Sequence, residues 1–263
     1  MVAGSFDDVV CLEVTPKGIS VNSVDKAQSS YLDAYFDSHG SNSIFRNFKC
    51  AKPYLLLYLH PKILSKLLKA TAGSTNLLST MQLEVGEAED RLTVRINSLS
   101  KLGISQTASY HISLLDATTD FEKVTVDGSA FHYTAEAMTS TPAILSDVIS
   151  QLKACGCQEV QLSISEDRMA FASMGAELPT QCELVLARHL EEGKLCLAAA
   201  EPTSSCKYAF KFFERIGKLA AVSTRLLLQM AGADAPLSVI ADLTGGGFVH
   251  IFIAPLTDIE EDG

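Results

Sequence analysis

CLEVTPKGISVNSVD, residues 11–25, and QLSISEDRMAFASMG, residues 161–175, are the two stretches that decide how this chain is organised. In each stretch an alternating strand meets a short polar turn, and a second alternating strand ends in the pattern apolar-x-apolar-x-Ser-apolar. Val14 of the first stretch corresponds to Ile164 of the second, and the same separation relates the other apolar positions. Because a constant separation across a whole hairpin rarely arises by chance, the sequence predicts a duplicated domain.

The composition is that of a folded, acidic protein. The chain has 263 residues, of which 47% are hydrophobic and 20% are charged, enough for one large core or two of ordinary domain size. Its net charge of −10 argues against a simple nucleic-acid binder, so the placement of basic residues matters more than their number. There is no apolar run long enough to span a bilayer and no signal-peptide pattern, so we expect no membrane partner.

Seven cysteines, mostly in apolar runs, favour reduced thiols that pack as small hydrophobic groups. The Cys155-Gly-Cys157 spacing is not a zinc pattern, and we predict no metal site.

Helical spacing of apolar residues predicts three helices: Pro61–Ala72, Thr141–Cys155 and Lys207–Val222. Moved back by the repeat distance, the second helix would begin before residue 1, so we expect the first half to lack its first strand and first helix. Antiparallel strands are predicted at Met81–Val85, Arg91–Ile96, Ser109–Leu115, Glu183–Ala187, Leu195–Ala199, Leu237–Asp242 and Phe248–Ile253. The fold class that follows is α+β, with two similar sheet-rich domains that carry helices on one face. The expected divisions are a domain at 1–115, an acidic connector at 116–130 and a domain at 131–263.

Two of the predicted helices each present one basic stripe. Helical spacing aligns one set on the first helix, Lys62, Lys66 and Lys69, and another on the third, Lys207, Lys211, Arg215 and Lys218. A single stripe is explained by a solvent-exposed face. Two matched stripes favour an anion facing them, because like charges at this spacing repel. The helix at 141–155 offers only Lys153.

Motifs for chemistry are missing from the sequence. The glycines at 245–247 lack the Lys-Ser/Thr of a phosphate loop, and neither a Gly-x-Ser-x-Gly nor a His-Glu-x-x-His motif occurs. We therefore expect no enzyme, no catalytic residue and no cofactor; an enzyme whose site is assembled from distant residues is the alternative from another class. With no module for reading bases, binding to DNA would be limited to phosphates and independent of sequence.

Four segments in order resemble the eukaryotic DNA sliding clamps, the proliferating cell nuclear antigen family. They are Gly18–Asp25 (GISVNSVD), Phe210–Lys218 (FKFFERIGK), Asp234–Val239 (DAPLSV) and Phe252–Pro255 (FIAP) followed by acidic residues. The resemblance implies a nuclear, non-enzymatic processivity factor of DNA replication and repair, made of three subunits joined head to tail around double-stranded DNA. The closest alternative is a subunit of the heterotrimeric DNA-damage checkpoint clamp, which shares the fold.

The resemblance also implies site residues. The residues expected to face DNA are Lys62, Lys66, Lys69, Lys153, Lys207, Lys211, Arg215 and Lys218. Those expected to bind partner peptides are Val24, Gln28, Val124, Val126, Pro236, Ala254 and Pro255. The peptides would carry a Gln-x-x-apolar-x-x-aromatic-aromatic motif and belong to DNA polymerase, nuclease, ligase and clamp loader. Ring closure would join Ser109–Leu115 of one subunit to Gln181–Ala187 of the next. Two departures from the family are the short N-terminus and a helix at 141–155 without its usual arginines.

Overall fold

The computed structural model describes residues 9–72, 78–99, 104–116, 125–174, 181–187, 194–200, 204–232 and 235–256. The helices are α1 (Pro61–Ala72), α2 (Ala143–Ala154) and α3 (Phe210–Ala220), with a 3₁₀ turn η2 (Gly128–Ala130). The strands of the first half are β1 (Val10–Thr15), β2 (Gly18–Val24), β3 (Ser30–Asp37), β4 (Leu55–Leu59), β5 (Leu78–Val85), β6 (Arg91–Leu99) and β7 (Ser105–Ser113). Those of the second half are β8 (Ala135–Thr139), β9 (Glu159–Ile164), β10 (Arg168–Met174), β11 (Glu183–Ala187), β12 (Leu195–Ala199), β13 (Ser204–Ala209), β14 (Ser223–Met230), β15 (Leu237–Leu243) and β16 (Phe248–Ile253).

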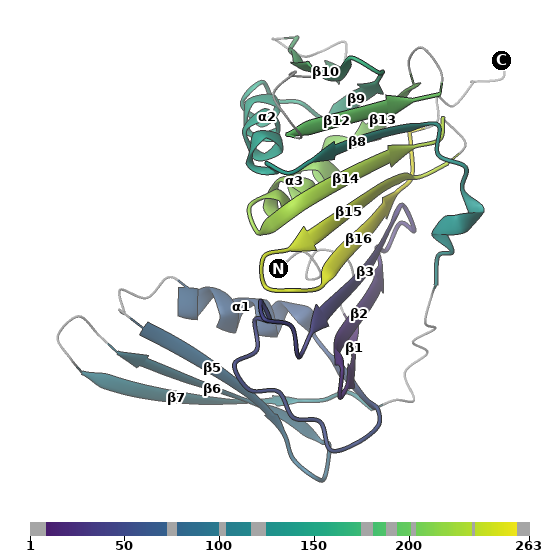
Figure 1. Cartoon of the computed structure of the whole chain (residues 1–263). Coiled ribbons are helices and arrows are strands. Elements are labelled where there is room, and N and C mark those ends of the chain that lie inside the picture. The colour runs from purple at the N-terminus through teal and green to yellow at the C-terminus, as the bar shows by residue number, and fades with distance from the viewer. Residues whose placement is uncertain are drawn as a thin grey trace.

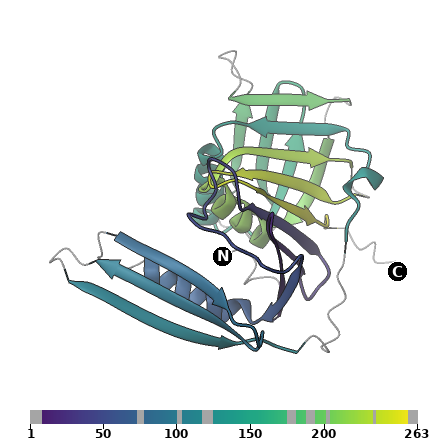
Figure 2. The same cartoon turned by 60° about the horizontal axis from the view of Figure 1, so that its bottom comes forward.

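Within the described segments the strands form three sheets, and one of these sheets contains strands from both halves of the chain. The largest has nine strands in the order β12-β8-β14-β15-β16-β3-β2-β1-β4. Antiparallel pairing of β16 with β3 therefore joins the two halves (Figure 1). The other sheets are β11-β10-β9-β13 and β5-β6-β7, and α1 lies along the face of the latter (Figure 2).

Strand pairing confirms the internal repeat. The pair Val14 and Ile19 of the first hairpin becomes Ile164 and Met169, so both members move by 150 residues. On the next strand, Phe36 opposite Ile19 becomes Leu186 opposite Met169, again a shift of 150. Strands β1, β2 and β3 therefore correspond to β9, β10 and β11.

The later strands of each half also correspond, but their residue numbers differ by less than 150. The pair Glu84 and Thr93 becomes Gln229 and Ser238, a shift of 145, which matches the buried core residues of β6 to those of β15. His111 opposite Thr93 becomes Phe252 opposite Ser238, a shift of 141. Strands β5, β6 and β7 therefore correspond to β14, β15 and β16. The α+β fold of two similar sheet-rich halves is confirmed.

The second half also contains two strands, β8 and β12, and one helix, α2, with no counterpart among the described strands and helices of the first half. Strand β8 pairs along β14, and α2 packs on α3, where the Ser146 hydroxyl donates to the Gly217 carbonyl oxygen at 2.8 Å. In the described part of the chain, β5 is an edge strand whose strand neighbour is β6.

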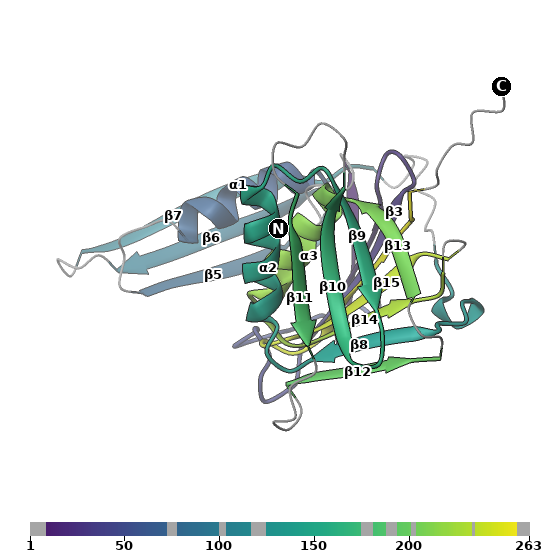
Figure 3. The same cartoon turned by 90° about the horizontal axis from the view of Figure 1, so that it is seen from above.

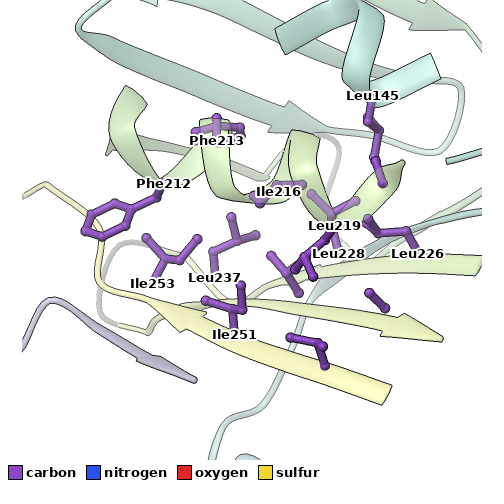
Figure 4. Packing of buried hydrophobic residues seen from close by; sticks show 14 of the residues in the cluster. Leu145, Phe212, Phe213, Ile216, Leu219, Leu226, Leu228, Leu237, Ile251 and Ile253 are labelled. Carbon is purple, nitrogen blue, oxygen red and sulfur yellow. The ribbon is translucent and has the colours of Figure 1, made fainter. Parts of the chain in front are cut away.

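The core of the second half lies between α3 and the large sheet. Figure 4 shows α3 side chains, including Phe212, Ile216 and Leu219, facing Leu237 and Ile253 of β15 and β16. All five are at most 3% exposed, and full burial of a large apolar side chain contributes about 1.5–3 kcal/mol. This packing fixes which side of α3 turns away from the sheet. Among the described residues no helix is long and apolar enough to cross a membrane.

The largest differences from the predicted element bounds are at α3 and β7. Helix α1 has the predicted bounds, but α3 begins at Phe210 and not at Lys207. The segment Ser204–Ala209 pairs with β9 over its whole length, and these long-range hydrogen bonds hold Lys207 in a strand. The strand expected at Ser109–Leu115 is Ser105–Ser113, and Leu115 forms an isolated bridge to Tyr58.

Candidate functional site

The three helices lie on one side of the molecule, inside the angle that the two halves form (Figure 1). Viewed from above, α2 and α3 lie side by side next to the four-stranded sheet, while η2 lies on the opposite side (Figure 3). The repeat explains this arrangement, because α1 and α3 follow the corresponding strands β4 and β13. The structure therefore has a helical inner side and a strand and loop outer side.

Two of the helices on this inner side, α1 and α3, carry exposed lysines. Lys62 and Lys66 of α1 are exposed, as are Lys211 and Lys218 of α3. The Lys211 ammonium lies 4.8 Å from the centre of the Phe212 ring, within the range of a cation–π contact. The Lys69 side chain lies outside the described residues. Facing DNA remains a prediction for these lysines.

Lys153 and Lys207 differ from these four exposed lysines, because one forms an ion pair and the other is half-buried in a strand. Lys153 is exposed on α2, and its Nζ lies 2.6 Å from Oε1 of Glu214 on α3. A surface ion pair of this kind contributes little stability, and it offsets part of the positive charge on the inner side. Lys207 is half-buried on β13, so it does not continue the α3 stripe.

Arg215 is the largest departure from the sequence prediction. Its side chain is 9% exposed, and Nη1 donates to the Ser30 hydroxyl of β3 at 2.9 Å. Burial lowers the pKa of the guanidinium, and the negative charge of Asp25 opposes that shift. The prediction that Arg215 belongs to an open basic stripe is wrong, because the turn between β2 and β3 covers this position of the helix.

Most of the predicted peptide-binding residues meet at one end of the large sheet. Val24 ends β2, and Gln28 is exposed in the following turn with a left-handed φ of 53°. The Ala254 amide donates to the Ser29 carbonyl at 2.9 Å, which brings the C-terminal segment beside this turn. Pro236 precedes Leu237, the cross-strand partner of Ile253, and therefore lies beside Ala254 and Pro255. Val126 is half-buried in the connector, and Val124 lies outside the described residues.

An aromatic cluster beneath the connector escaped the sequence analysis. Phe252 lies 6.1 Å from both Tyr31 of β3 and Phe131, measured between ring centres, and 4.1 Å from His250. A Cβ added to Gly128 of η2 would lie 3.3 Å from Phe252, so the connector backbone rests on this ring. The alternation of β16 was the available signal, since His250 and Phe252 share a face at spacing two.

His250 is the titratable member of the cluster. Its Nε2 lies 2.8 Å from the Ser238 hydroxyl, and burial lowers its pKa to about 4. The ring is therefore neutral at pH 7, when it packs against Phe252. Among the described residues, no group of three or more His, Cys, Asp or Glu side chains could hold a metal ion.

Two halves that repeat one pattern of strands, joined edge to edge with helices on the inner side, define a DNA-clamp fold. The comparison with solved structures identifies it as the fold of proliferating cell nuclear antigen (PCNA). The chain resembles PCNA from Entamoeba histolytica with a TM-score of 0.75 and 18% identity, covering 97% of this chain and 92% of that one. It resembles a chain of the PCNA2-PCNA3 complex from Sulfolobus tokodaii with a TM-score of 0.77 and 15% identity, at the same coverages. Searches with protein-family models and against curated proteins found no match.

Proposed function

We propose that this chain is a subunit of a DNA sliding clamp, a non-enzymatic ring that encircles double-stranded DNA and tethers replication and repair proteins to it. DNA would pass along the helical inner side, near Lys62, Lys66, Lys211 and Lys218. Partner peptides of DNA polymerase, nuclease, ligase and clamp loader would bind on the outer side, near Val24, Gln28 and Ala254. We propose the nucleus as its location.

The observation that carries this proposal is the junction between β16 and β3. Strand β7 is the counterpart of β16, and β11 is the counterpart of β3, yet β7 and β11 are edge strands among the strands that the structure describes. Exposed apolar side chains accompany these edges: Val185 on β11 is 47% exposed and Tyr110 on β7 is 39% exposed. Open strand edges invite pairing, so β7 of one copy would pair with β11 of the next copy, in the same way that β16 pairs with β3 within the chain.

The repeat also predicts the register of this pairing. Within the chain, Phe248 of β16 lies opposite Tyr35 of β3. Applying the shifts of 141 and 150 places Thr107 of one copy opposite Val185 of the next. A head-to-tail contact of this kind closes into a ring when the rotation per subunit permits, and three subunits are the number that the clamp fold suggests.

A ring of unlike subunits is the second candidate, which includes the DNA-damage checkpoint clamp. It is favoured by the Sulfolobus structure, which is a complex of two different PCNA chains. The two candidates differ in whether the purified chain assembles alone.

The test is disulfide trapping of the double variant Thr107→Cys, Val185→Cys. Directly opposed residues of antiparallel strands have Cα atoms about 4.5–5.5 Å apart, within the range that a disulfide spans. We expect the purified variant to give covalent dimers and trimers under mild oxidation, and the wild-type chain to have the solution mass of a trimer.

The matched control is Ser105→Cys combined with Val185→Cys. Ser105 lies on the same face of β7 but two residues out of register, and diagonal pairs about 7–8 Å apart are too distant for efficient cross-linking. A monomeric wild-type chain, together with a Thr107→Cys, Val185→Cys variant that gives no covalent oligomers, would refute the self-assembling ring and favour unlike subunits. Equal trapping of both variants would refute the predicted register.

A further inference from the structure

We propose that Arg215 is a positioning residue for partner-peptide binding: it holds the β2–β3 turn, residues 25–30, in the place where that turn supports the C-terminal segment 254–256. The inference rests on the proposed function, because it concerns the peptide site of the clamp. It gives Arg215 a role toward the outer side of the molecule, although its helix carries the lysines of the inner side.

The first step is the burial of the guanidinium at the junction between the halves. Arg215 follows Lys211 by one helical turn and precedes Lys218, yet it is 9% exposed while both lysines are exposed. Its Nη1 donates to the hydroxyl of Ser30, a residue 185 positions away in the sequence that is 4% exposed. Placing a charged group in such surroundings is unfavourable unless the group is paired, and Asp25 provides the opposite charge.

The second step is the rigidity of the turn that Arg215 contacts. The Asp25 carboxylate, 7% exposed, accepts from the amides of Ser29 and Ser30 at 2.7 and 2.8 Å and from the Ser29 hydroxyl at 2.8 Å. The Gln28 amide donates to the Asp25 carbonyl at 2.8 Å. This network holds Gln28 in a left-handed conformation that residues other than glycine rarely adopt, which requires support from its surroundings.

The third step links the turn to the segment expected to receive the peptide. The Ser29 carbonyl accepts from the Ala254 amide at 2.9 Å, and two residues later the Leu256 amide donates to the Lys207 carbonyl at 2.8 Å. Segment 254–256 is therefore held between the 25–30 turn and β13. If the turn moves, the anchor at Ala254 moves with it, and Gln28 changes position relative to that anchor.

The experiment measures binding of a fluorescent peptide carrying the Gln-x-x-apolar-x-x-aromatic-aromatic motif to the full chain. We expect Arg215→Met to weaken binding about tenfold, the scale of coupling between contacting residues. Arg215→Lys keeps the charge and should recover most of the affinity. Arg225→Met is the matched control, because Arg225 lies on β14 in an exposed ion pair with Asp242 and outside both proposed binding surfaces.

A readout specific to positioning is the double variant Arg215→Met, Asp25→Asn. Both residues act through one turn, so the loss of affinity in the double variant should be well below the product of the single losses. Hydrogen exchange at the Ser29, Ser30 and Ala254 amides should increase in Arg215→Met. Should that variant fail to fold, Asp25→Asn alone, compared with Arg225→Met, tests whether loosening the turn weakens peptide binding.

The outcomes separate this inference from the proposed function. Wild-type chain that assembles and binds the peptide, with a folded Arg215→Met variant that binds equally well, would refute the positioning role alone. Wild-type chain that binds no such peptide would refute the tethering function and this inference together. Loss of affinity equal to that of Arg225→Met would show a general loss of stability and refute the positioning role.

Discussion

His250 makes the stability of the clamp fold depend on pH in a way that one substitution can remove. Its ring packs against Phe252 beneath the connector and forms a hydrogen bond with the Ser238 hydroxyl. Burial lowers the pKa of His250 from 6.5 to about 4. The unfolded chain therefore binds a proton at this residue at a higher pH than the folded chain does. Stability is fully present above pH 6.5 and decreases as the pH falls from 6.5 toward 4.

The size of this loss follows from the two pKa values. Each pH unit between them corresponds to at most about 1.4 kcal/mol, and discounting for the partial exposure of His250 gives a loss of about 2 kcal/mol by pH 4. Carboxylates titrate in the same range, so the quantity to measure is the difference between the wild type and His250→Gln. Glutamine keeps a hydrogen-bonding group for Ser238 but does not titrate.

Urea unfolding followed by circular dichroism at half-unit steps from about pH 4 to 7.5 would provide the free energies of unfolding. We expect His250→Gln to be the less stable protein at pH 7, through weaker packing, but to lose about 2 kcal/mol less than the wild type on acidification. His132→Gln, at an exposed histidine, is the control and should follow the wild-type slope. Parallel curves for wild type and His250→Gln would refute the argument that burial keeps this ring neutral.

Two further predictions concern the inner side and the hairpin between β15 and β16. Reversing Lys211 and Lys218 to Glu should shorten clamp retention on DNA without unfolding the protein. The slope of the logarithm of the binding constant against the logarithm of the salt concentration should become shallower by about 0.9 for each phosphate that is no longer neutralised. Unchanged retention by a folded ring would mean that these lysines only face water. Gly247→Ala should destabilise the protein by about 2 kcal/mol or more in thermal unfolding, because φ is 94° there and an added Cβ would overlap the Tyr35 carbonyl. The control Gly86→Ala has open space around it and should be close to neutral, so equal effects of the two changes would contradict the steric reasoning.

Local pattern predicted those parts of the fold whose interactions are local. Helix α1 has the expected bounds because its apolar spacing and its proline at the first turn act within the helix itself. The sequence prediction begins the third helix at Lys207, because Lys207 continues the helical spacing of Lys211, whereas Ser204–Ala209 is a strand. Its strand conformation depends on β9, which lies far earlier in the sequence, and no turn separates it from α3. Strand β4 is a continuous apolar run, and periodicity alone does not identify such a strand.

The candidate site shows the same limit. Helical spacing correctly puts Arg215 on the same side of α3 as Lys211 and Lys218, but spacing does not reveal what covers that side. Ser30 lies 185 residues away and reaches Arg215 only because β16 pairs with β3. Arg215, although flanked by exposed lysines, is therefore buried and joins the two halves of the chain through its hydrogen bond to Ser30.

The pairing of β16 with β3 also suggests where a closed clamp would open to admit DNA. This seam has aromatic pairs on its outer face, Tyr31 with Phe252 and Tyr35 with Phe248, and the connector also ties the two halves together covalently. The corresponding positions between copies are His111 opposite Gln181 and Thr107 opposite Val185, with no covalent tie. In the proposed ring we therefore expect the junction between copies to open before the junction within a subunit.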